Sequence, residues 1–328
     1  MKESRNILIS RLPIVEDITL KENMTITDLI NEFGKSGGFT AKKVYVATQI
    51  LLDMITDTES TNFLSFPAAI IATGTRGAIT EFLKRKFFDI IITTCGTVDH
   101  DVARCWRNYH HGWFEADDIE LSKMNIHRLG NIFIPLENYG EIIEKVTQDF
   151  LKQLYDSGIR EISTYELLSK LGEYMDKCPK KEESLLWWAW KNNVKIFVPG
   201  ITDGAFGYQI WLFSQQYKDF KINILADETE ISNAIYDSTR TGALVIGGGI
   251  SKHHVIWWNQ FKDGLDRAVY VTTAVEWDGS LSGARTREAI SWGKISQKAR
   301  HITVEGDATV LIPLIGAYLI SKVEERKR

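Results

Sequence analysis

The chain has 328 residues, of which 44% are hydrophobic, as expected for a soluble protein whose core fills one large domain or two. Its formal charge of −4 shows no excess of lysine and arginine that would bind phosphates, so nucleic acid is not expected as a partner. The three cysteines lack CxxC spacing, so we expect neither a disulfide framework nor structural zinc. Neither a signal pattern nor an apolar run of roughly 18 residues is present, so we expect a cytoplasmic protein without membrane association.

The first half of the sequence predicts an N-terminal extension followed by a strand–helix–strand unit. We assign residues 1–38 to the extension, with a short helix near 25–33, and residues 39–328 to a single catalytic domain. Residues 115–140 are expected to be irregular. The other elements expected from apolar patterning are a helix over Thr40–Ile55, a buried strand or core segment over Phe66–Ala72, a helix ending near Lys86, a strand over Asp89–Thr94 and helices over Asp99–Trp106 and Glu141–Leu154.

The second half alternates strands and helices more plainly. The expected helices are Thr164–Met175, Glu183–Lys191, Phe206–Tyr217, a segment ending at Ile235 and Leu311–Val323. The expected strands are Val194–Val198, Ile222–Leu225, Ala243–Ile246, Val269–Thr273 and His301–Glu305. This alternation predicts an α/β fold, with a mostly parallel, Rossmann-like sheet covered by helices on both faces.

Small and acidic residues follow four of the predicted strands. These strand ends are Thr94-Cys95-Gly96, Asp203-Gly204, Gly247-Gly248-Gly249 and Gly306-Asp307. Such ends let a backbone approach phosphates closely and leave aspartates for ribose hydroxyls. The pattern therefore favours a dinucleotide ligand, although the sequence has no GxGxxG and a triple glycine alone also forms a tight turn.

Residues 276–294 join a carboxylate-bearing Gly/Ser turn to a short helical run. Glu288 and Trp292 are four residues apart, so they share a helix face and offer a carboxylate and an indole to a cation. Lys294 joins them only if the helix loosens near Gly293. A lysine pressed against an indole loses hydration, which lowers its pKa and frees the amine to attack a carbonyl or imine carbon. The alternative is a solvated lysine at a helix end.

The segment from Asp99 to His111 is rich in histidine and carboxylate side chains. Its histidines at 100, 110 and 111 lack the i, i+4 spacing of a helical metal pair. No metal site is therefore expected, and the segment is interpreted as the beginning of a helix whose N-terminal groups face the ligand.

Several motifs together resemble the deoxyhypusine synthase family over about residues 40–320. These motifs are Thr202–Gly207, Ile246–His254, Glu276–Ser280, Ser282–Arg285 and Glu288–Ile295. Thr93–Asp101 looks like the archaeal branch of that family. The resemblance implies a homotetramer with sites at a dimer interface, which binds NAD and transfers the aminobutyl group of spermidine to one lysine of translation factor aIF5A, forming deoxyhypusine.

The resemblance also implies roles for individual residues. Lys294 matches the lysine that carries the covalent imine, and His253 matches the histidine that accepts a proton from the substrate amine. Without the family, a lone histidine near a strand end, such as His253, is more commonly a hydrogen-bonded core residue. The implied substrate contacts are Glu288, Trp292, Gly279, Ser280, Tyr208, Asp99 and His100. The implied cofactor contacts are Thr94, Cys95, Gly96, Asp203, Gly248, Gly249, Thr273, Ala274, Asp307 and Ala308.

Departures from the family pattern leave alternatives open. Tyr208 and Leu281 stand where the eukaryotic pattern has acidic residues, and Ala68-Ala69 stands where it has Ser-Asn. Losing two carboxylates removes charge partners for a polycation, so another amine donor such as agmatine stays open. The rival functions are homospermidine synthase-like transfer to a small diamine, an inactive NAD-binding regulatory subunit, which the presence of Lys294 disfavours, and a plain dehydrogenase.

Overall fold

The computed structural model describes residues 9–327 and is built around one six-stranded sheet. Residues 1–8 of the predicted extension and Arg328 lie outside the described residues. Every strand pairing in this sheet is parallel. Its strands are β1 (Ser60–Ser65), β2 (Ile90–Ile92), β7 (Lys195–Phe197), β9 (Arg240–Ile246), β10 (Leu265–Thr272) and β11 (Ile295–Glu305).

The strand order is β11-β10-β9-β1-β2-β7. From β1 the chain adds β2 and β7 on one side, then returns to add β9, β10 and β11 on the other. This is the strand order of a doubly wound dinucleotide-binding sheet. The side on which new strands are added changes between β1 and β9, while all strands stay parallel. The predicted α/β, Rossmann-like fold is confirmed.

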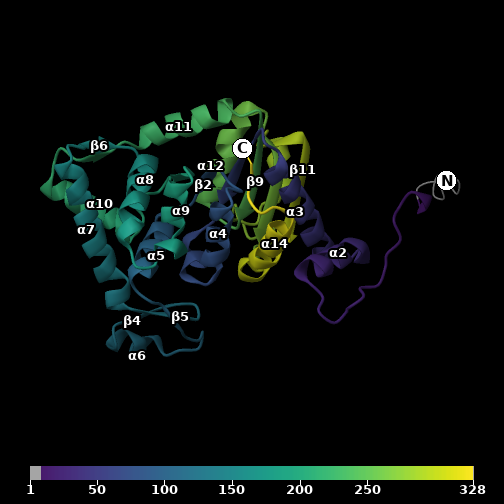
Figure 1. Ribbon diagram of the computed structural model, residues 1–328, viewed down its shortest axis with the longest axis horizontal. Helices are drawn as coiled ribbons and strands as arrows, with labels where there is room; N and C mark the ends of the chain where they lie inside the picture. Colours follow the sequence, from purple (N-terminus) through teal and green to yellow (C-terminus); the bar gives the residue numbers. More distant parts are fainter. Residues whose placement is uncertain (1–8, 328) are drawn as a thin grey trace.

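Helices cover both faces of the sheet (Figure 1). Adjacent residues of β1 point to opposite faces: Leu64 belongs to the larger core and Phe63 to the smaller one. The larger core includes side chains from α3 (Phe39–Thr56), α4 (Thr75–Lys84), α5 (Cys95–Trp106) and α14 (Ala308–Lys322). The smaller core includes side chains from α11 (Ile224–Tyr236), α12 (Ile250–Asn259) and α13 (Thr286–Ser291).

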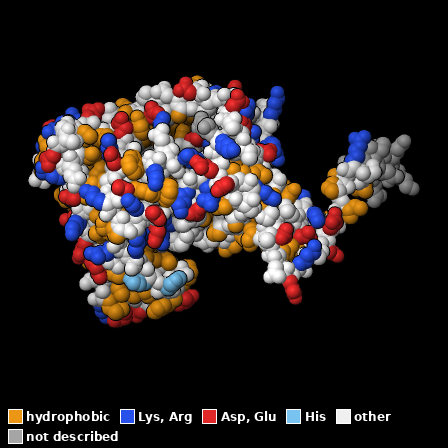
Figure 2. Space-filling view, viewed as in Figure 1, with side chains coloured by type: hydrophobic (Ala, Val, Ile, Leu, Met, Phe, Trp, Pro, Cys, Tyr) orange, Lys and Arg blue, Asp and Glu red, His pale blue; other side chains and the backbone are white. Residues whose placement is uncertain are grey.

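Between β2 and β7, and directly after β7, the chain adds a helical layer and a small lobe (Figure 1). The helices are α7 (Gly140–Asp156), α8 (Thr164–Tyr174), α9 (Leu185–Lys191) and α10 (Ala205–Gln216), joined by the short pair β6 (Glu161–Ile162) and β8 (Lys221–Ile222). The lobe consists of β3 (His110–His111), α6 (Asp118–Lys123), β4 (Ile126–Leu129) and β5 (Ile132–Pro135), and Figure 2 shows hydrophobic side chains on its surface. Within residues 9–327, no helix combines the length and the apolar character that crossing a bilayer requires.

Two predicted elements are wrong, and a third resolves to one of its two alternatives. The segment Phe66–Ala72, expected as a buried strand or a core segment, is a core segment: Phe66 and Ile70 are buried in the larger core and 68–72 form a 3-10 helix. The strand lies earlier, at Ser60–Ser65. Hydropathy misses this strand because four of its six residues are polar, and its buried Asn62 amide is satisfied by the carbonyls of Met54 and Phe87 at 3.1 and 3.0 Å. The segment 115–140 holds α6, β4 and β5 rather than irregular chain. The strand expected at 222–225 ends at Ile222, since α11 begins at Ile224.

The prediction of unpaired cysteines is also wrong. Cys105 and Cys178 form a disulfide across 73 positions of sequence, and Cys95 is free and buried. Cys105 lies near the end of α5, whereas Cys178 follows a short 3-10 helix after α8, so the pair meets only in the folded chain. Spacing along the sequence carries no sign of this contact.

The C-terminal part of the predicted extension is tied to the body. Helix α2 (Ile26–Ser36) begins with a capping box between Thr25 and Asp28, and Ile30 is buried in the larger core. Helix α2 packs on α3 and α14, whereas the preceding segment projects from the body (Figure 1). The boundary at residue 38 stays a prediction.

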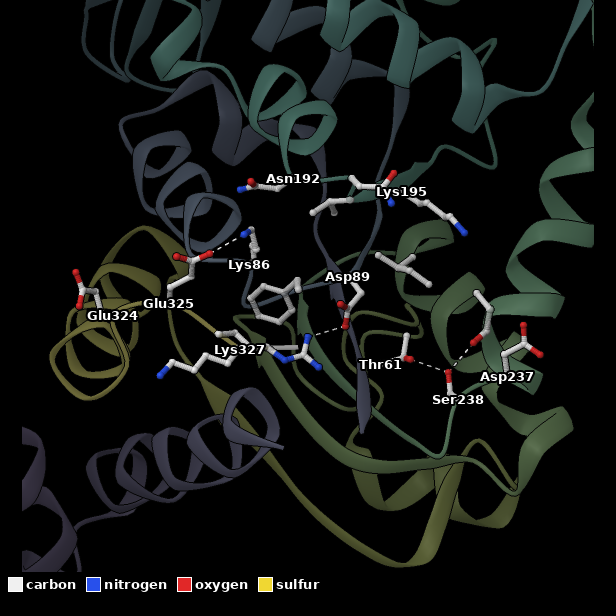
Figure 3. Close-up of a pocket in the computed structure, with 16 residues that line it drawn as sticks. Thr61, Lys86, Asp89, Asn192, Lys195, Asp237, Ser238, Glu324, Glu325 and Lys327 are labelled. Atoms are coloured by element: carbon white, nitrogen blue, oxygen red, sulfur yellow. Dashed lines mark hydrogen bonds and ion pairs between the residues drawn. The ribbon is translucent and has the colours of Figure 1, made fainter. Parts of the chain in front are cut away.

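Arg326 anchors the C-terminal segment at the amino-terminal edge of the sheet. Its guanidinium donates to the carboxylate of Asp89 at 2.7 Å and to the carbonyl of Ser60, and only 1% of its side chain is exposed. A cavity of about 900 Å³ lies beside it, lined also by Lys86, Asp89 and Lys195 (Figure 3).

We expect Arg326→Ala to lower the free energy of unfolding by about 3 kcal/mol, because it leaves Asp89 without its buried cationic partner. The exposed neighbour Lys327 is the matched control, and Lys327→Ala should change stability by less than about 0.5 kcal/mol. Urea unfolding followed by circular dichroism measures both. Equal stability of the two variants would contradict this role of Arg326.

Candidate active site

The residues predicted to contact a cofactor lie at one edge of the sheet. Because the six strands are parallel, the turns that follow them meet at the carboxyl edge. These turns carry Thr94, Cys95 and Gly96 after β2, Asp203 after β7, Gly248 and Gly249 after β9, Thr273 and Ala274 after β10, and Asp307 and Ala308 after β11. The structure therefore gathers the whole predicted set at the edge where doubly wound folds bind ligands.

The turn between β9 and α12 is tight at Gly248 and presents polar groups that suit a phosphate. Gly247 and Gly248 adopt positive φ values of 52° and 89°. A Cβ added to Gly248 would lie 2.6 Å from Oγ of Ser251, whose fully buried hydroxyl has no hydrogen-bond partner in the described structure. Free N–H groups at a helix start and an unpaired hydroxyl are donors that suit a phosphate. The turn fits a dinucleotide.

Two glycines, which lack a Cβ, allow the neighbouring turns to approach each other closely. A Cβ on Gly96 would lie 2.8 Å from Cβ of Ala68 in the segment after β1. A Cβ on Gly204 would lie 2.7 Å from Sγ of Cys95. Glycine at these two positions brings the turns after β1, β2 and β7 into contact at the edge of the sheet.

Asp99 is engaged inside the protein. It is 1% exposed and accepts hydrogen bonds from the N–H groups of Ala205 at 2.9 Å and Phe206 at 2.7 Å and from the Tyr139 hydroxyl at 3.1 Å. The carboxylate thus stabilises the N-terminus of α10. This gives Asp99 a structural role, and its predicted contact with substrate stays a prediction.

His100 is similarly enclosed. Its Nδ1 lies 3.0 Å from the Tyr109 hydroxyl, and burial lowers the pKa of the imidazole to about 4. The ring is therefore neutral near pH 7. Among residues 9–327, no three His, Cys, Asp or Glu side chains gather in a way that would hold a metal ion.

Helices α12 and α13 lie on the same face of the sheet and carry the predicted site residues His253 and Glu288. Helix α12 packs on β1, β2 and β9, and α13 packs on β10 and β11. His253 is exposed on α12 and stacks on Trp257 with ring centroids 5.6 Å apart. Glu288 is exposed on α13. The sheet thus brings together residues that lie 35 positions apart in the sequence.

The chain after α13 turns at Gly293 and carries Lys294 to Trp292. The helix ends at Ser291, and Gly293 adopts a left-handed φ of 67°. The N–H of Lys294 then donates to the carbonyl of Ala289 at 2.9 Å, and Nζ lies 5.2 Å from the centroid of the Trp292 ring. The helix therefore loosens near Gly293, which is the condition for Lys294 to join Trp292.

Lys294 and His253 are electrostatic neighbours. Partial burial, and then the positive charge of Lys294, lower the pKa of His253 below its ordinary value of 6.5. His253 is therefore mostly neutral near pH 7 and able to accept a proton. A neutral imidazole beside a primary amine suits chemistry in which a substrate loses a proton and the lysine attacks carbon.

The described chain does not enclose these side chains on its own. Lys294 is only half-buried, and Trp292 is 64% exposed. Tyr208 and Trp277 are exposed as well. The cavity in Figure 3 lies at the amino-terminal edge of the sheet, and none of the predicted site residues lines it. Excluding water from Lys294 therefore requires another surface.

Comparison with known proteins agrees with this arrangement. The sequence model of the family described as deoxyhypusine synthase matches residues 28–319. The chain belongs to the deoxyhypusine synthase family. It is therefore a transferase of the hypusine pathway, whose family moves an aminobutyl group to a lysine.

Named relatives of this deoxyhypusine synthase family member are archaeal. A protein of Picrophilus torridus named probable deoxyhypusine synthase is 53% identical over 303 residues, covering 92% of this chain and 96% of the relative. One of Ignicoccus hospitalis with the same name is 50% identical over 316 residues, covering 95% and 97%. The predicted archaeal resemblance is confirmed.

Solved structures share the fold. A deoxyhypusine synthase homologue from Entamoeba histolytica has a TM-score of 0.64 at 20% identity, covering 96% of this chain and 98% of the other. AgrE, solved as a ternary complex with ornithine and NAD+, has a TM-score of 0.52 at 10% identity, covering 88% of this chain and 34% of AgrE.

Sequence reasoning assigned no role to Ser251 and Lys252, although both lie within the deoxyhypusine synthase motif at 246–254. Lys252 is 2% exposed. The burial of Lys252 could have been predicted from the sequence. Residues 252, 255, 256 and 259 recur at helical spacing, and all four are buried in α12. A lysine on the apolar face of a helix indicates a structural or functional partner inside the protein.

We expect Gly293→Ala to impair this deoxyhypusine synthase family member by moving Lys294. A Cβ would meet nothing within 4 Å, so the cost is conformational: a left-handed alanine costs about 1–2 kcal/mol. Relief of that strain would displace Lys294 from Trp292 and lower the transfer rate roughly tenfold or more.

Gly158, at φ 97° and equally free of contacts, follows α7 and is the control for conformational strain alone. Gly158→Ala should cost similar stability and leave Lys294 in place. Steady-state kinetics and thermal melting distinguish the variants, and a wild-type transfer rate in Gly293→Ala would exclude this role of the turn.

Proposed function

We propose that this protein uses NAD to transfer the aminobutyl group of spermidine, through an imine on Lys294, to a specific lysine of translation factor aIF5A. The observation that carries the proposal is the turn at Gly293, which sets Lys294 beside Trp292 and close to the neutral imidazole of His253. Family membership supports the transfer of an aminobutyl group to a lysine.

The residues that would hold NAD are those of the carboxyl edge. The turn at Gly248 and Gly249 would receive a phosphate, with Asp203 and Asp307 available for ribose hydroxyls. The fold that this chain shares with AgrE, which was solved with NAD+, supports this choice. When bound, NAD would accept a hydride from the carbon beside the secondary amine of spermidine and return it at the end of the cycle.

The chain's own residues perform the remaining steps. The His253 imidazole takes the proton from the secondary amine as the carbon–nitrogen double bond forms. Nζ of Lys294 attacks that carbon, the carbon–nitrogen bond to diaminopropane breaks, and an imine joins Lys294 to the butylamine fragment. The acceptor lysine then attacks the same carbon and releases Lys294 as a free amine. Glu288 and Trp292 would hold the cationic end of the donor.

The donor is the least constrained part of the proposal. Tyr208 is exposed and lies beside Trp211, with ring centroids 5.5 Å apart, which supplies aromatic faces rather than a carboxylate. Leu281 offers only its backbone carbonyl, and Lys252 occupies it. Spermidine stays our choice, and agmatine is the alternative.

A second copy of the chain would complete the site. The exposure of His253, Trp292 and Tyr208 supports a homotetramer whose sites lie at a dimer interface. Burial against that interface would exclude water from Lys294 and from the imine that it carries. We propose a cytoplasmic location, where aIF5A is made.

Product analysis tests this function. The protein is incubated with NAD, one amine donor and either aIF5A precursor or putrescine as the acceptor. We expect spermidine-dependent gain of one aminobutyl group on one aIF5A lysine without net NADH. Homospermidine formation without protein modification would favour the diamine acceptor, stoichiometric NADH would favour a dehydrogenase, and no product with any donor would favour an inactive NAD-binding subunit.

A further inference from the structure

Lys252 is a buried cation held by backbone oxygens. Its Nζ donates to the carbonyls of Leu281 and Ala284, both at 2.7 Å, and lies 4.2 Å from the centroid of the Tyr270 ring. A lysine that is 2% exposed is costly to fold unless its charge is compensated. Two short charge-assisted bonds and an aromatic face supply that compensation.

These bonds connect the two halves of the candidate site. Lys252 precedes His253 on α12, and the Leu281–Ala284 turn leads into α13 and on to Lys294. Within the described structure, the other side-chain hydrogen bond that joins this turn to the sheet is between Ser282 and Thr272, at 3.1 Å. A tie at Lys252 therefore fixes α13 relative to α12.

We propose that Lys252 is a positioning residue for the transfer reaction, which ties the Leu281–Ala284 turn to α12 and so sets the spacing between His253 and Lys294. This inference rests on the proposed function for its kinetic consequence. The tie itself is a structural statement that can be tested without any activity.

The charges around Lys252 fit this role. Burial lowers the pKa of its amine to about 8, and the carboxylate of Glu288 on α13 opposes that shift, whereas Arg285 before α13 adds to it. Tyr270 on β10 faces the amine as a neutral phenol, since burial raises its pKa. The amine is mostly charged near pH 7 and loses its proton, and with it the charge-assisted bonds, as the pH rises through about 8.

The test compares Lys252→Met with Lys262→Met. Methionine keeps the length and apolar stem of lysine but donates no hydrogen bond. Lys262 is a matched control because its Nζ also donates to two carbonyls, those of Ile235 and Tyr236 at 3.1 and 2.9 Å, at the far end of the same helical segment. Hydrogen exchange, kcat and KM are measured for both variants and the wild type.

We expect Lys252→Met to speed amide exchange over residues 279–291 and to lower kcat at least tenfold, while the KM for acceptor protein changes less than threefold. Lys262→Met should match the wild type in both. Unchanged exchange over 279–291, or a wild-type kcat, would overturn the proposal. Faster exchange over the whole chain would show that Lys252 only stabilises the fold in general, which would overturn the proposal as well.

Wild-type protein decides the matter if Lys252→Met does not fold. After correction for intrinsic exchange rates, protection over residues 279–285 should fall as the pH rises from 7 to 9.5, with no parallel loss in α3. Constant protection would overturn the tie. If the wild type makes no transfer product at all, the proposed function fails while the exchange result still judges the tie.

Discussion

Lys294→Ala is expected to abolish aminobutyl transfer, lowering the rate by at least about a thousandfold, because the variant has no amine on which to carry the imine. NAD binding should be retained. Lys294 is not among the residues predicted to hold the cofactor, so removing its amine leaves the turns at the carboxyl edge intact.

Product assays and titration calorimetry with NAD measure the two effects separately. Lys298, an exposed lysine four positions along β11, is the control, and Lys298→Ala should transfer at the wild-type rate. Full transfer by Lys294→Ala would remove the covalent mechanism. Loss of NAD binding together with transfer would instead indicate a structural defect.

His253→Ala is expected to slow imine formation roughly a hundredfold, the usual effect of losing a general base. The pH dependence gives a second signature. The neutral imidazole is the active form, and its pKa lies below 6.5, so kcat/KM should rise with pH through a value below 6.5 and then level off. In His253→Ala this acid limb should disappear.

Single-turnover measurements between pH 5 and 8 give both quantities. The exposed His111, on the lobe away from α12 and α13, is the control, and its substitution by alanine should leave the profile unchanged. An unchanged rate and acid limb in His253→Ala would assign the proton to another group.

The sequence was sufficient to predict the fold class and the edge of the sheet at which the predicted cofactor contacts meet. Residues such as Thr94 and Gly248 follow the carboxyl ends of strands. In a parallel sheet all such ends lie at the same edge, so these residues are expected to meet there. The break at Gly293 was likewise predictable, since helical geometry keeps Lys294 away from Trp292 unless the helix ends between them.

Contacts between distant segments account for what the sequence did not reveal. The polar strand at Ser60–Ser65 is stable because hydrogen bonds from other segments satisfy Asn62. Asp99 fits a ligand-binding pattern yet serves the N-terminus of α10, more than 100 positions away. Lys252 likewise depends on carbonyls about 30 positions away. Each of these is a tertiary interaction that local patterning does not encode.

Trapping the intermediate tests the central claim most directly. The protein is incubated with NAD and spermidine, treated with cyanoborohydride, which reduces an imine to a stable amine, and mapped by intact and peptide mass spectrometry. We predict one aminobutyl group on Lys294 and none in Lys294→Ala. An adduct with agmatine or putrescine alone would change the donor and keep the mechanism. No adduct on Lys294 with any of the three amines would contradict the proposed function.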